Sequence, residues 1–225
     1  YTIDGKQAGI SVGASCAQVA QRLMELGCVD AVGLDGGGST TIGVTYPDQN
    51  SMQVINSPSD GAERANSTAV FLTTEQKATG EPAALMLNPG DALVLAGAQV
   101  PFSAQTVDTA YYAMGAASGV TYTASGAGSV TDGGLFTAGS SAGKAIITGR
   151  ANEVSGTANV TVVSTPSQIN ITNESTGGAV QAISLEPGES IPLSAASVWK
   201  NLSLRSQDTC YTWACDEAVG TVTAE

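Results

Sequence analysis

The stretch Ala31–Val44, AVGLDGGGSTTIGV, places three consecutive glycines directly after an aspartate that ends an apolar run. Glycine destabilises a regular helix or strand because it loses the most backbone freedom on folding. The runs before Asp35 and after Ser39 are typical of strands, so the glycines fall in the connection between two strands. Two interpretations stay open. Asp35 could bond the local backbone of a hairpin turn, or the glycine N–H groups could bind an anionic oxygen.

The segments on either side predict a small α+β region. Residues 15–27, SCAQVAQRLMELG, carry apolar residues at the spacing of one helical face, with Ser15 placed as an N-cap and Gly27 just beyond the helix end. The strands that we expect lie in residues 1–12 (a hairpin around a DG turn), 29–35, 40–46, 52–56 and 67–74. Residues 1–75 are therefore predicted to form one helix packed on a mainly antiparallel sheet.

A second polar cluster follows in the loop at residues 55–66, INSPSDGAERAN, which contains Asn56, Ser57, Asp60, Glu63 and Arg64. Adjacent Glu63 and Arg64 could form no more than a solvated ion pair. Alternatively, Arg64 binds a phosphate or carboxylate through two hydrogen bonds while a carboxylate transfers a proton. Both interpretations stay open.

The turn at residues 2–7, TIDGKQ, adds another acid, Asp4, and another cation, Lys6. By itself it predicts only a DG turn. Lys6, Arg22 and Arg64 are the cations of residues 1–75, and their scarcity favours a functional role for the cations near these loops.

The composition disfavours several classes of function. The chain has 225 residues, a formal net charge of −12 and no histidine. Without histidine there is no Ser-His-Asp triad, Cys-His pair or His-ligated metal in this stretch, and no cofactor is predicted, although a need for a divalent metal stays open. The negative charge disfavours nucleic-acid binding, and no apolar run approaches the length of a membrane span. Low charge with many Ser, Thr and Gly residues indicates a secreted or cell-surface protein.

The four cysteines fall in two pairs. Cys16 and Cys28 flank the predicted helix, which would hold them roughly 18 Å apart at ~1.5 Å per residue, too far for a disulfide. Cys210 and Cys215 would point to opposite faces of a regular strand. A turn could still join them, so free thiols and a disulfide both stay open.

Residues 76–225 carry short β-prone runs separated by turn residues, which is typical of β-sandwiches. The pattern repeats, because LMLNPGDALVL at 85–95 matches ISLEPGESIPL at 183–193, and TYTASGAGSVTD at 121–132 is echoed by TWACDEAVGTVTA at 212–224. In the first copy, strands are predicted at 84–87, 92–97, 119–125, 134–139, 143–151 and 157–163.

Three regions follow from these patterns: 1–75, a sandwich at 76–165, and the start of a second sandwich at 166–225. The last is expected to be truncated, because the counterparts of 134–139 and 143–151 are missing and a sandwich without them leaves an open core. We therefore expect the natural chain to continue. Since there is no initiating Met, we also expect it to begin within a longer protein.

Together these residues resemble a known family. TIDGKQ with the following SVG, the helix ending in LGC, AVGLDGGGSTT and NSPSDGAERA have the order and spacing of the C-terminal half of the phosphodiester glycosidase domain, over residues 1–74. That family includes N-acetylglucosamine-1-phosphodiester α-N-acetylglucosaminidase and many secreted bacterial proteins. Residues 83–165 and 183–225 resemble bacterial Ig-like (group 2) repeats. One departure is Lys6, where the family usually has arginine, which weakens a bidentate contact there.

The resemblance implies a multi-domain fold, with an α+β partial catalytic domain followed by all-β Ig-like sandwich modules. It implies a secreted bacterial enzyme that hydrolyses a sugar-1-phosphodiester to free sugar and a phosphomonoester. The N-terminal half of the catalytic domain is expected upstream in cis or as a separate chain, and the fragment alone is expected to be inactive. The alternative is a non-catalytic surface or adhesion module in which the glycine loop is purely structural.

The resemblance also implies roles for individual residues. Asp35 and Glu63 would supply the carboxylates for proton transfer or nucleophilic attack on the sugar, and Arg64 would anchor the anion. The residues predicted to bind the substrate are Gly36, Gly37, Gly38, Ser39, Asn56, Asp4 and Lys6. No metal ligand is predicted.

Overall fold

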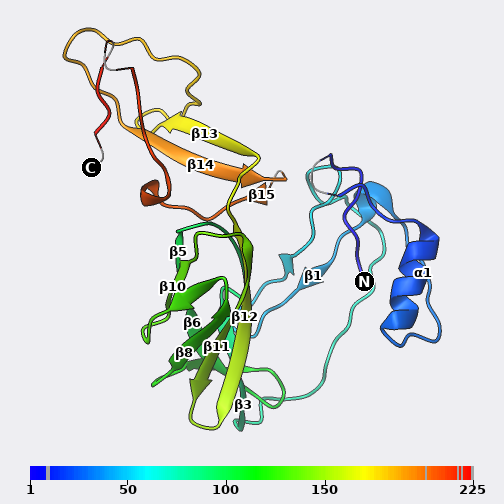
Figure 1. Ribbon diagram of the computed structural model, residues 1–225. Helices are drawn as coiled ribbons and strands as arrows, with labels where there is room; N and C mark the ends of the chain where they lie inside the picture. Colours follow the sequence, from blue (N-terminus) through cyan, green and yellow to red (C-terminus); the bar gives the residue numbers. More distant parts are fainter. Residues whose placement is uncertain (9–10, 201, 217, 219, 224–225) are drawn as a thin grey trace. The chain divides into compact units, whose positions relative to one another are not determined.

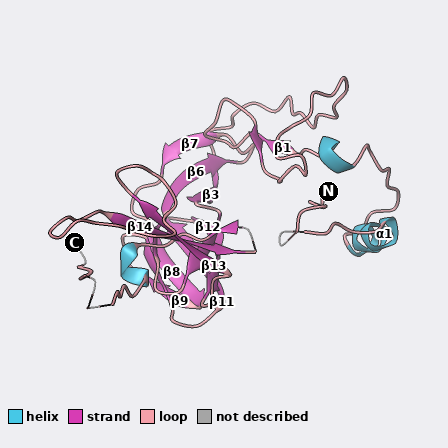
Figure 2. Cartoon of the chain, turned by 90° about the horizontal axis from the view of Figure 1, so that it is seen from above, coloured by secondary structure: helices cyan, strands magenta, loops and turns pink. Residues whose placement is uncertain are grey.

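The computed structural model describes residues 1–8, 11–200, 202–216, 218 and 220–223. The chain divides into two compact units, Tyr1–Lys77 and Ala78–Glu225, which we name the N-terminal unit and the C-terminal unit (Figure 1). The α-helix belongs to the N-terminal unit, whereas the C-terminal unit is built mostly of strands (Figure 2). No helix in the described part of the chain is both long and apolar enough to span a membrane.

The helix predicted in the N-terminal unit is confirmed as α1 (Cys16–Glu25). It begins with a capping box, in which the Ser15 hydroxyl accepts the Gln18 N–H at 3.3 Å and the Gln18 side chain accepts the Ser15 N–H at 2.8 Å. It ends before Gly27, which has a φ of +85°. Arg22 pairs with Glu25 at 3.1 Å, and this hydrogen bond raises the pKa of the Arg22 guanidinium.

The sheet predicted beneath this helix is much smaller than expected. Among the described residues of this unit, β1 (Gly43–Val44) and β2 (Gln53–Val54) form an antiparallel two-residue ladder, and α1 buries no side chain. In the hairpin predicted at residues 1–12, one isolated antiparallel bridge, between Gln7 and Ser11, is formed. The strands predicted at 29–35 and 67–74 are wrong, since Val29 is 94% exposed and Leu72 is 100% exposed. A strand needs a neighbouring strand to take up its backbone hydrogen bonds, and the described residues of this unit offer none to these segments.

The first repeat copy forms three small sheets around one apolar cluster. Its strands are β3 (Pro82–Asn88), β4 (Asp91–Leu95), β5 (Gln99–Pro101), β6 (Ser103–Asp108), β7 (Ala113–Ala116), β8 (Thr121–Gly126), β9 (Gly128–Val130), β10 (Leu135–Ala138), β11 (Gly143–Ala151) and β12 (Val154–Val163). The sheet orders are β4-β12-β11-β8, β3-β6-β7 and β5-β10-β9. Within them β12 and β4 run parallel, and the other neighbours are antiparallel. Each of the six strands predicted for this copy overlaps an observed one.

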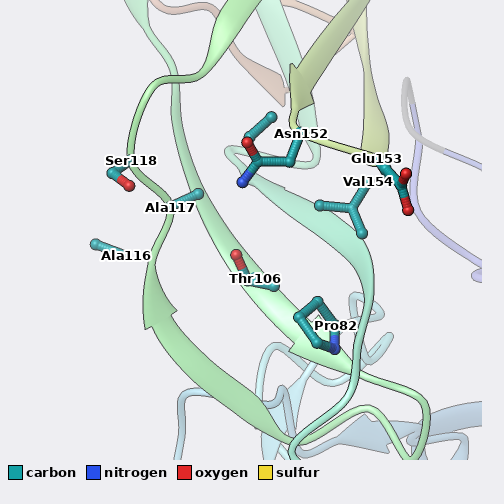
Figure 3. Close-up of a pocket in the computed structure, with 9 residues that line it drawn as sticks. Pro82, Thr106, Ala116, Ala117, Ser118, Asn152, Glu153 and Val154 are labelled. Atoms are coloured by element: carbon teal, nitrogen blue, oxygen red, sulfur yellow. The ribbon is translucent and has the colours of Figure 1, made fainter.

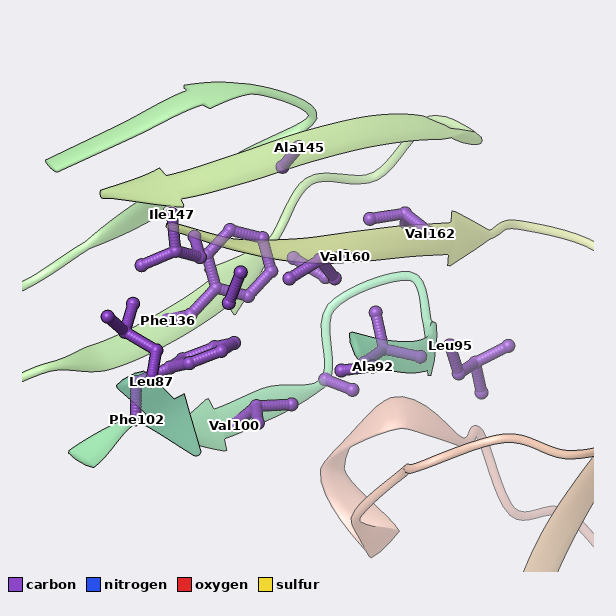
Figure 4. Packing of buried hydrophobic residues seen from close by; sticks show 14 of the residues in the cluster. Leu87, Ala92, Leu95, Val100, Phe102, Phe136, Ala145, Ile147, Val160 and Val162 are labelled. Atoms are coloured by element: carbon purple, nitrogen blue, oxygen red, sulfur yellow. The ribbon is translucent and has the colours of Figure 1, made fainter. Parts of the chain in front are cut away.

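The core of this copy forms because buried and exposed residues alternate along its strands. Val100, Phe136, Ile147 and Val160 each have 2% or less of their surface exposed and project into one cluster (Figure 4). The sheet that contains β3 packs closely across β12, because a Cβ at Gly156 would overlap the Leu85 carbonyl. Glycine is therefore required where the two strands meet.

The second copy differs from the first despite its matching sequence. It contains the sheet β13-β14-β15, made of β13 (Gln168–Asn173), β14 (Leu193–Trp199) and β15 (Leu202–Ser203), and a 3₁₀ turn, η2 (Asp208–Cys210). The repeat segment 183–192 forms no strand, and the described residues from 211 onward form none either. Leu87 is 3% exposed, whereas its counterpart Leu185 is 44% exposed. The sandwich pattern predicted from the repeat is thus only partly realised in this copy.

The second copy is hydrogen-bonded to the first through an edge strand. The Arg205 N–H donates to the Leu93 carbonyl at 2.9 Å, and the Arg205 carbonyl accepts the Leu95 N–H at 2.9 Å. Gln207 and Gln99 exchange two further hydrogen bonds of 2.8 and 2.7 Å. Leu204 is buried in the apolar cluster of the first copy. These contacts cover the free edge of β4, which would otherwise offer unpaired backbone groups to solvent. All four cysteines are free.

Candidate active site

The candidate site lies around the three glycines of the N-terminal unit. Gly37–Ser39 form a single 3₁₀ turn, η1, closed by a hydrogen bond of 3.1 Å from the Thr40 N–H to the Gly37 carbonyl. Gly37 has a φ of +67°, a left-handed conformation that other residues rarely adopt. Gly38 is the buried residue of this unit among those that the structure describes. The connection predicted from the sequence is therefore a tight turn that needs glycine for its backbone.

A carboxylate lies directly against the buried glycine. Asp60, in the loop after β2, is so close to Gly38 that a Cβ at position 38 would overlap its carboxylate group. Glycine at position 38 thus allows a charged side chain to approach the main chain. The sequence places Asp60 in the polar loop at residues 55–66, but there the family resemblance implies the catalytic role for Glu63.

Two cations accompany this carboxylate. The Arg64 Nε donates to Asp60 Oδ2 at 2.6 Å, and Arg64 Nη1 lies 3.5 Å from the Ser39 hydroxyl. The Lys6 ammonium lies against the same turn, at Gly37, since a Cβ there would be 3.5 Å from Nζ. Three separate loops therefore bring Lys6, Ser39, Asp60 and Arg64 to one turn.

Asp4 and Asn56 connect these loops to one another. The Asn56 side chain accepts the Ile42 N–H at 2.8 Å and donates to the Thr40 carbonyl at 2.9 Å and to Asp4 Oδ1 at 3.1 Å. Asp4 Oδ1 also accepts the Ser57 N–H at 3.0 Å. Both side chains already use polar atoms to fix the chain that leaves the glycine turn. Their predicted contact with substrate stays a prediction.

A further pair, not foreseen from the sequence, completes this network. Gln7 donates through Nε2 to the Ser57 carbonyl at 2.7 Å and accepts the Ser57 hydroxyl at 2.9 Å. Gln7 follows Lys6 directly, so these bonds fix the loop that carries the lysine. Both residues lie in loops that the sequence singles out, and the three-dimensional pairing shows that they hold these loops together.

The two carboxylates predicted to be catalytic lie at the edge of this arrangement. Asp35 is exposed, and its Oδ1 accepts the Gly36 N–H at 3.0 Å, which is the local turn bond considered from the sequence. Glu63 is exposed and makes no hydrogen bond or ion pair with the other described residues. The structure thus gathers Lys6, Ser39 and Arg64 around the turn and places Asp60, rather than Glu63, against it.

This arrangement is suited to binding an anionic group. Two cations beside backbone that carries no side chain can approach phosphate or carboxylate oxygens closely. The guanidinium is held by Asp60 through Nε, which leaves the edge formed by its two Nη atoms for a bidentate contact. No group of three or more His, Cys, Asp and Glu side chains that could hold a metal ion occurs among the described residues.

The C-terminal unit offers an open groove of about 580 Å³ beside β6, β7 and the β11–β12 turn (Figure 3). Its lining residues are Pro82, Thr106, Ala116, Ala117, Ser118, Ala151, Asn152, Glu153 and Val154. Glu153 is the one ionisable side chain in this set. A lone carboxylate among small and amide side chains supplies neither a nucleophile–base pair nor a cation, so the groove lacks a catalytic set.

The family model described as phosphodiester glycosidase matches residues 1–73 of the chain. The match covers the whole arrangement around the glycine turn, including Lys6, Asp60 and Arg64, and does not reach the C-terminal unit. No match to the chain was found among curated proteins.

Proposed function

We propose that the N-terminal unit carries part of the active site of a hydrolase that cleaves sugar-1-phosphodiesters to free sugar and a phosphomonoester. The observation that supports it best is that Lys6 and Arg64, from two other loops, converge on the Gly37–Ser39 turn, where Arg64 contacts the Ser39 hydroxyl. This convergence falls inside the segment that matches the phosphodiester glycosidase family. An anion-binding turn is what a substrate with a phosphodiester group requires.

In this mechanism the phosphodiester lies against the turn, with Lys6 and Arg64 neutralising its charge. The bond between the anomeric carbon and the phosphate oxygen breaks, and positive charge develops on the sugar ring as the phosphomonoester leaves. Water supplies the oxygen that completes the free sugar and gives up a proton. We assign the stabilising and proton-transferring carboxylates to Asp35 and Glu63, as the family resemblance implies.

The exposed apolar segments of the N-terminal unit support a larger catalytic domain. Residues 29–34 and 69–72 have the composition of buried strands yet lie in solvent, with Leu72 fully exposed. Exposed runs of this kind mark surfaces that another part of a protein covers. We propose that further polypeptide, in cis or as a separate chain, pairs with these segments and completes the site. The C-terminal unit would then be an Ig-like spacer of a secreted or cell-surface bacterial enzyme.

The test is to incubate the intact protein with a panel of sugar-1-phosphodiesters and to measure the phosphomonoester that is released. Arg64→Ala is expected to lower kcat/KM by roughly 100-fold, because it removes a charged donor aimed at the reacting group. Arg22→Ala removes the same charge from α1, where the arginine pairs with Glu25, and is expected to leave the rate unchanged.

Asp35→Asn and Glu63→Gln test the assigned carboxylates in the same assay. If both variants hydrolyse the substrate like the wild type, the assignment of these two residues is wrong. If no phosphodiester of the panel is hydrolysed by the intact protein, or if Arg64→Ala behaves like Arg22→Ala, the proposed function itself is wrong. A non-catalytic surface module would hydrolyse no phosphodiester of the panel.

A further inference from the structure

The contact between Asp60 and Arg64 has an unusual setting for a surface ion pair. Its Nε–Oδ2 distance is 2.6 Å, while the two side chains remain 43% and 53% exposed. Pairs as exposed as this contribute little to folding stability, because water screens both charges. The geometry around it is nevertheless restrictive, since a side chain at position 38 would displace the carboxylate. Stability alone therefore does not account for the arrangement.

The orientation of the guanidinium suggests what the pair does. Arginine has five N–H donors in a planar fork, and its two edges can bind different partners. Asp60 takes the Nε donor, and Nη1 points toward the Ser39 hydroxyl at 3.5 Å. The edge that binds phosphate in a bidentate manner is thereby held beside Ser39, in the same turn whose Gly37 contacts the Lys6 ammonium.

We propose that Asp60 is a positioning residue, which acts through Arg64 to hold the guanidinium in the orientation that binds the phosphate group at this turn. It does not touch the substrate. The proposal rests on the proposed function, because it specifies how the same turn binds its anion. Fixing Arg64 in advance removes the cost of ordering a long, flexible side chain when the ligand binds.

The direction in which Asp60→Asn changes the affinity for phosphate distinguishes this positioning role from simple charge repulsion. A carboxylate beside an anion site repels the anion, so Asp60→Asn would tighten phosphate binding if Asp60 were only a nearby charge. If Asp60 positions Arg64, the same variant weakens binding, by about two- to tenfold, the range that corresponds to ordering one long side chain.

The experiment titrates the full chain with inorganic phosphate and follows the amide resonances of Gly37–Ser39. Wild type, Asp60→Asn and Asp48→Asn are compared; Asp48 is an exposed aspartate of the same unit that lies outside the site. We expect weaker binding for Asp60→Asn and a wild-type or slightly higher affinity for Asp48→Asn. Equal or tighter binding by Asp60→Asn overturns the proposal, as does a wild type that binds no phosphate.

A double-mutant cycle excludes a merely structural effect. In an Arg64→Ala background, Asp60→Asn is expected to cause no further loss, because the residue through which Asp60 acts is gone. Losses that add up in the double variant overturn the positioning role. Phosphate binding that follows these expectations without hydrolysis of any sugar-1-phosphodiester would retain the positioning role and reject the enzymatic function, so the two proposals fail separately.

Discussion

At residue 38, the candidate site leaves no room for a side chain. An alanine Cβ would overlap the Asp60 carboxylate, so Gly38→Ala must move either Asp60 or the turn, and Arg64 moves with it. We expect a loss of roughly 100-fold in sugar-1-phosphodiester hydrolysis, since small displacements of positioning groups have effects of this size.

The matched control for this substitution is Gly133→Ala, in an exposed turn of the C-terminal unit. A Cβ at Gly133 would meet only the Thr131 hydroxyl, at an ordinary 3.9 Å, so the variant is expected to hydrolyse the substrate at the wild-type rate. Equal rates for Gly38→Ala and Gly133→Ala, measured as kcat/KM on the intact protein, would show that the contact between Gly38 and Asp60 is not required.

In the C-terminal unit, Asp108 is a buried carboxylate with a structural role. It accepts the backbone N–H groups of Tyr112 (2.8 Å), Gly80 (3.2 Å), Thr79 (2.6 Å) and Ala110 (2.9 Å). Burial by itself would raise the pKa of Asp108, but these four hydrogen bonds outweigh it and hold the pKa below its ordinary value of 3.8. The ionised carboxylate thus ties the start of β3 to the β6–β7 turn.

Asp108→Asn is expected to lower the midpoint of thermal unfolding by several degrees at neutral pH. An amide offers one oxygen as acceptor and turns an NH₂ group toward the remaining N–H donors. The pKa of Asp108 is lower in the folded state than in the unfolded state. The ionised carboxylate therefore stabilises the fold above pH 3.8, and this stabilisation is lost as the pH falls through the pKa of the folded state.

The difference in melting temperature between wild type and Asp108→Asn should therefore be constant from about pH 7 to about pH 5 and shrink as the pH is lowered below 3.8. Asp132→Asn removes the same charge from an exposed position of this unit and serves as the control. A difference that stays constant below pH 3.8 as well would show that the ionised state of Asp108 does not stabilise the fold.

At the scale of elements, the two repeat copies give a matched pair of core substitutions. Leu87 in β3 is 3% exposed, whereas its counterpart Leu185 is 44% exposed and belongs to no strand. Leu87→Ala is expected to lower the free energy of unfolding by about 2–5 kcal/mol. For Leu185→Ala we expect a change of about 0.5 kcal/mol or less. Denaturant unfolding of the full chain measures both, and equal losses would mean that 183–193 is packed like the first copy.

This contrast also shows what the sequence could and could not predict. Apolar and polar residues alternate in β3, β4, β11 and β12, and the strands that this pattern predicts do form. They form because each has a pairing strand within the same copy. The same alternation of apolar and polar residues at 183–192 and the apolar run at 29–35 are typical of strands, but no strand forms there, since no described strand takes up their hydrogen bonds. An apolar–polar pattern indicates that a segment tends to form a strand, but a sheet forms only where a neighbouring strand pairs with it.

The candidate site was predictable in part for a similar reason. Gly37, Gly38, Ser39 and Arg64 stand out by residue type within two polar loops, and Lys6 by the scarcity of cations. The position of Asp60 against Gly38 depends on how the loops fold onto each other, and the local spacing did not reveal it. Residue types indicated the site, and long-range contacts decided which carboxylate lies in it.

At the scale of the whole molecule, burial is unevenly divided between the units. All the buried hydrophobic residues of the described chain belong to the C-terminal unit. The N-terminal unit is held mainly by hydrogen bonds among its loops, with exposed apolar runs at 29–34 and 69–72. Small units without an apolar core are only marginally stable by themselves. The unit with the candidate site is thus the less stable of the two as the described residues stand, which agrees with the covering polypeptide proposed above.

In the C-terminal unit, Leu204 of the second copy is 6% exposed in the apolar cluster of the first copy, and we expect it to hold the two copies together. Leu204→Ala should weaken this packing by about 2 kcal/mol or more and release the backbone pairing beside it. Hydrogen exchange at the Leu95 and Gln99 amides, which bond to Arg205 and Gln207, should then accelerate, while the amide of Ile147 in β11 keeps its protection. Leu202→Ala, at a 43% exposed position, is the control. Unchanged exchange at Leu95 and Gln99 would show that the copies are held together without Leu204.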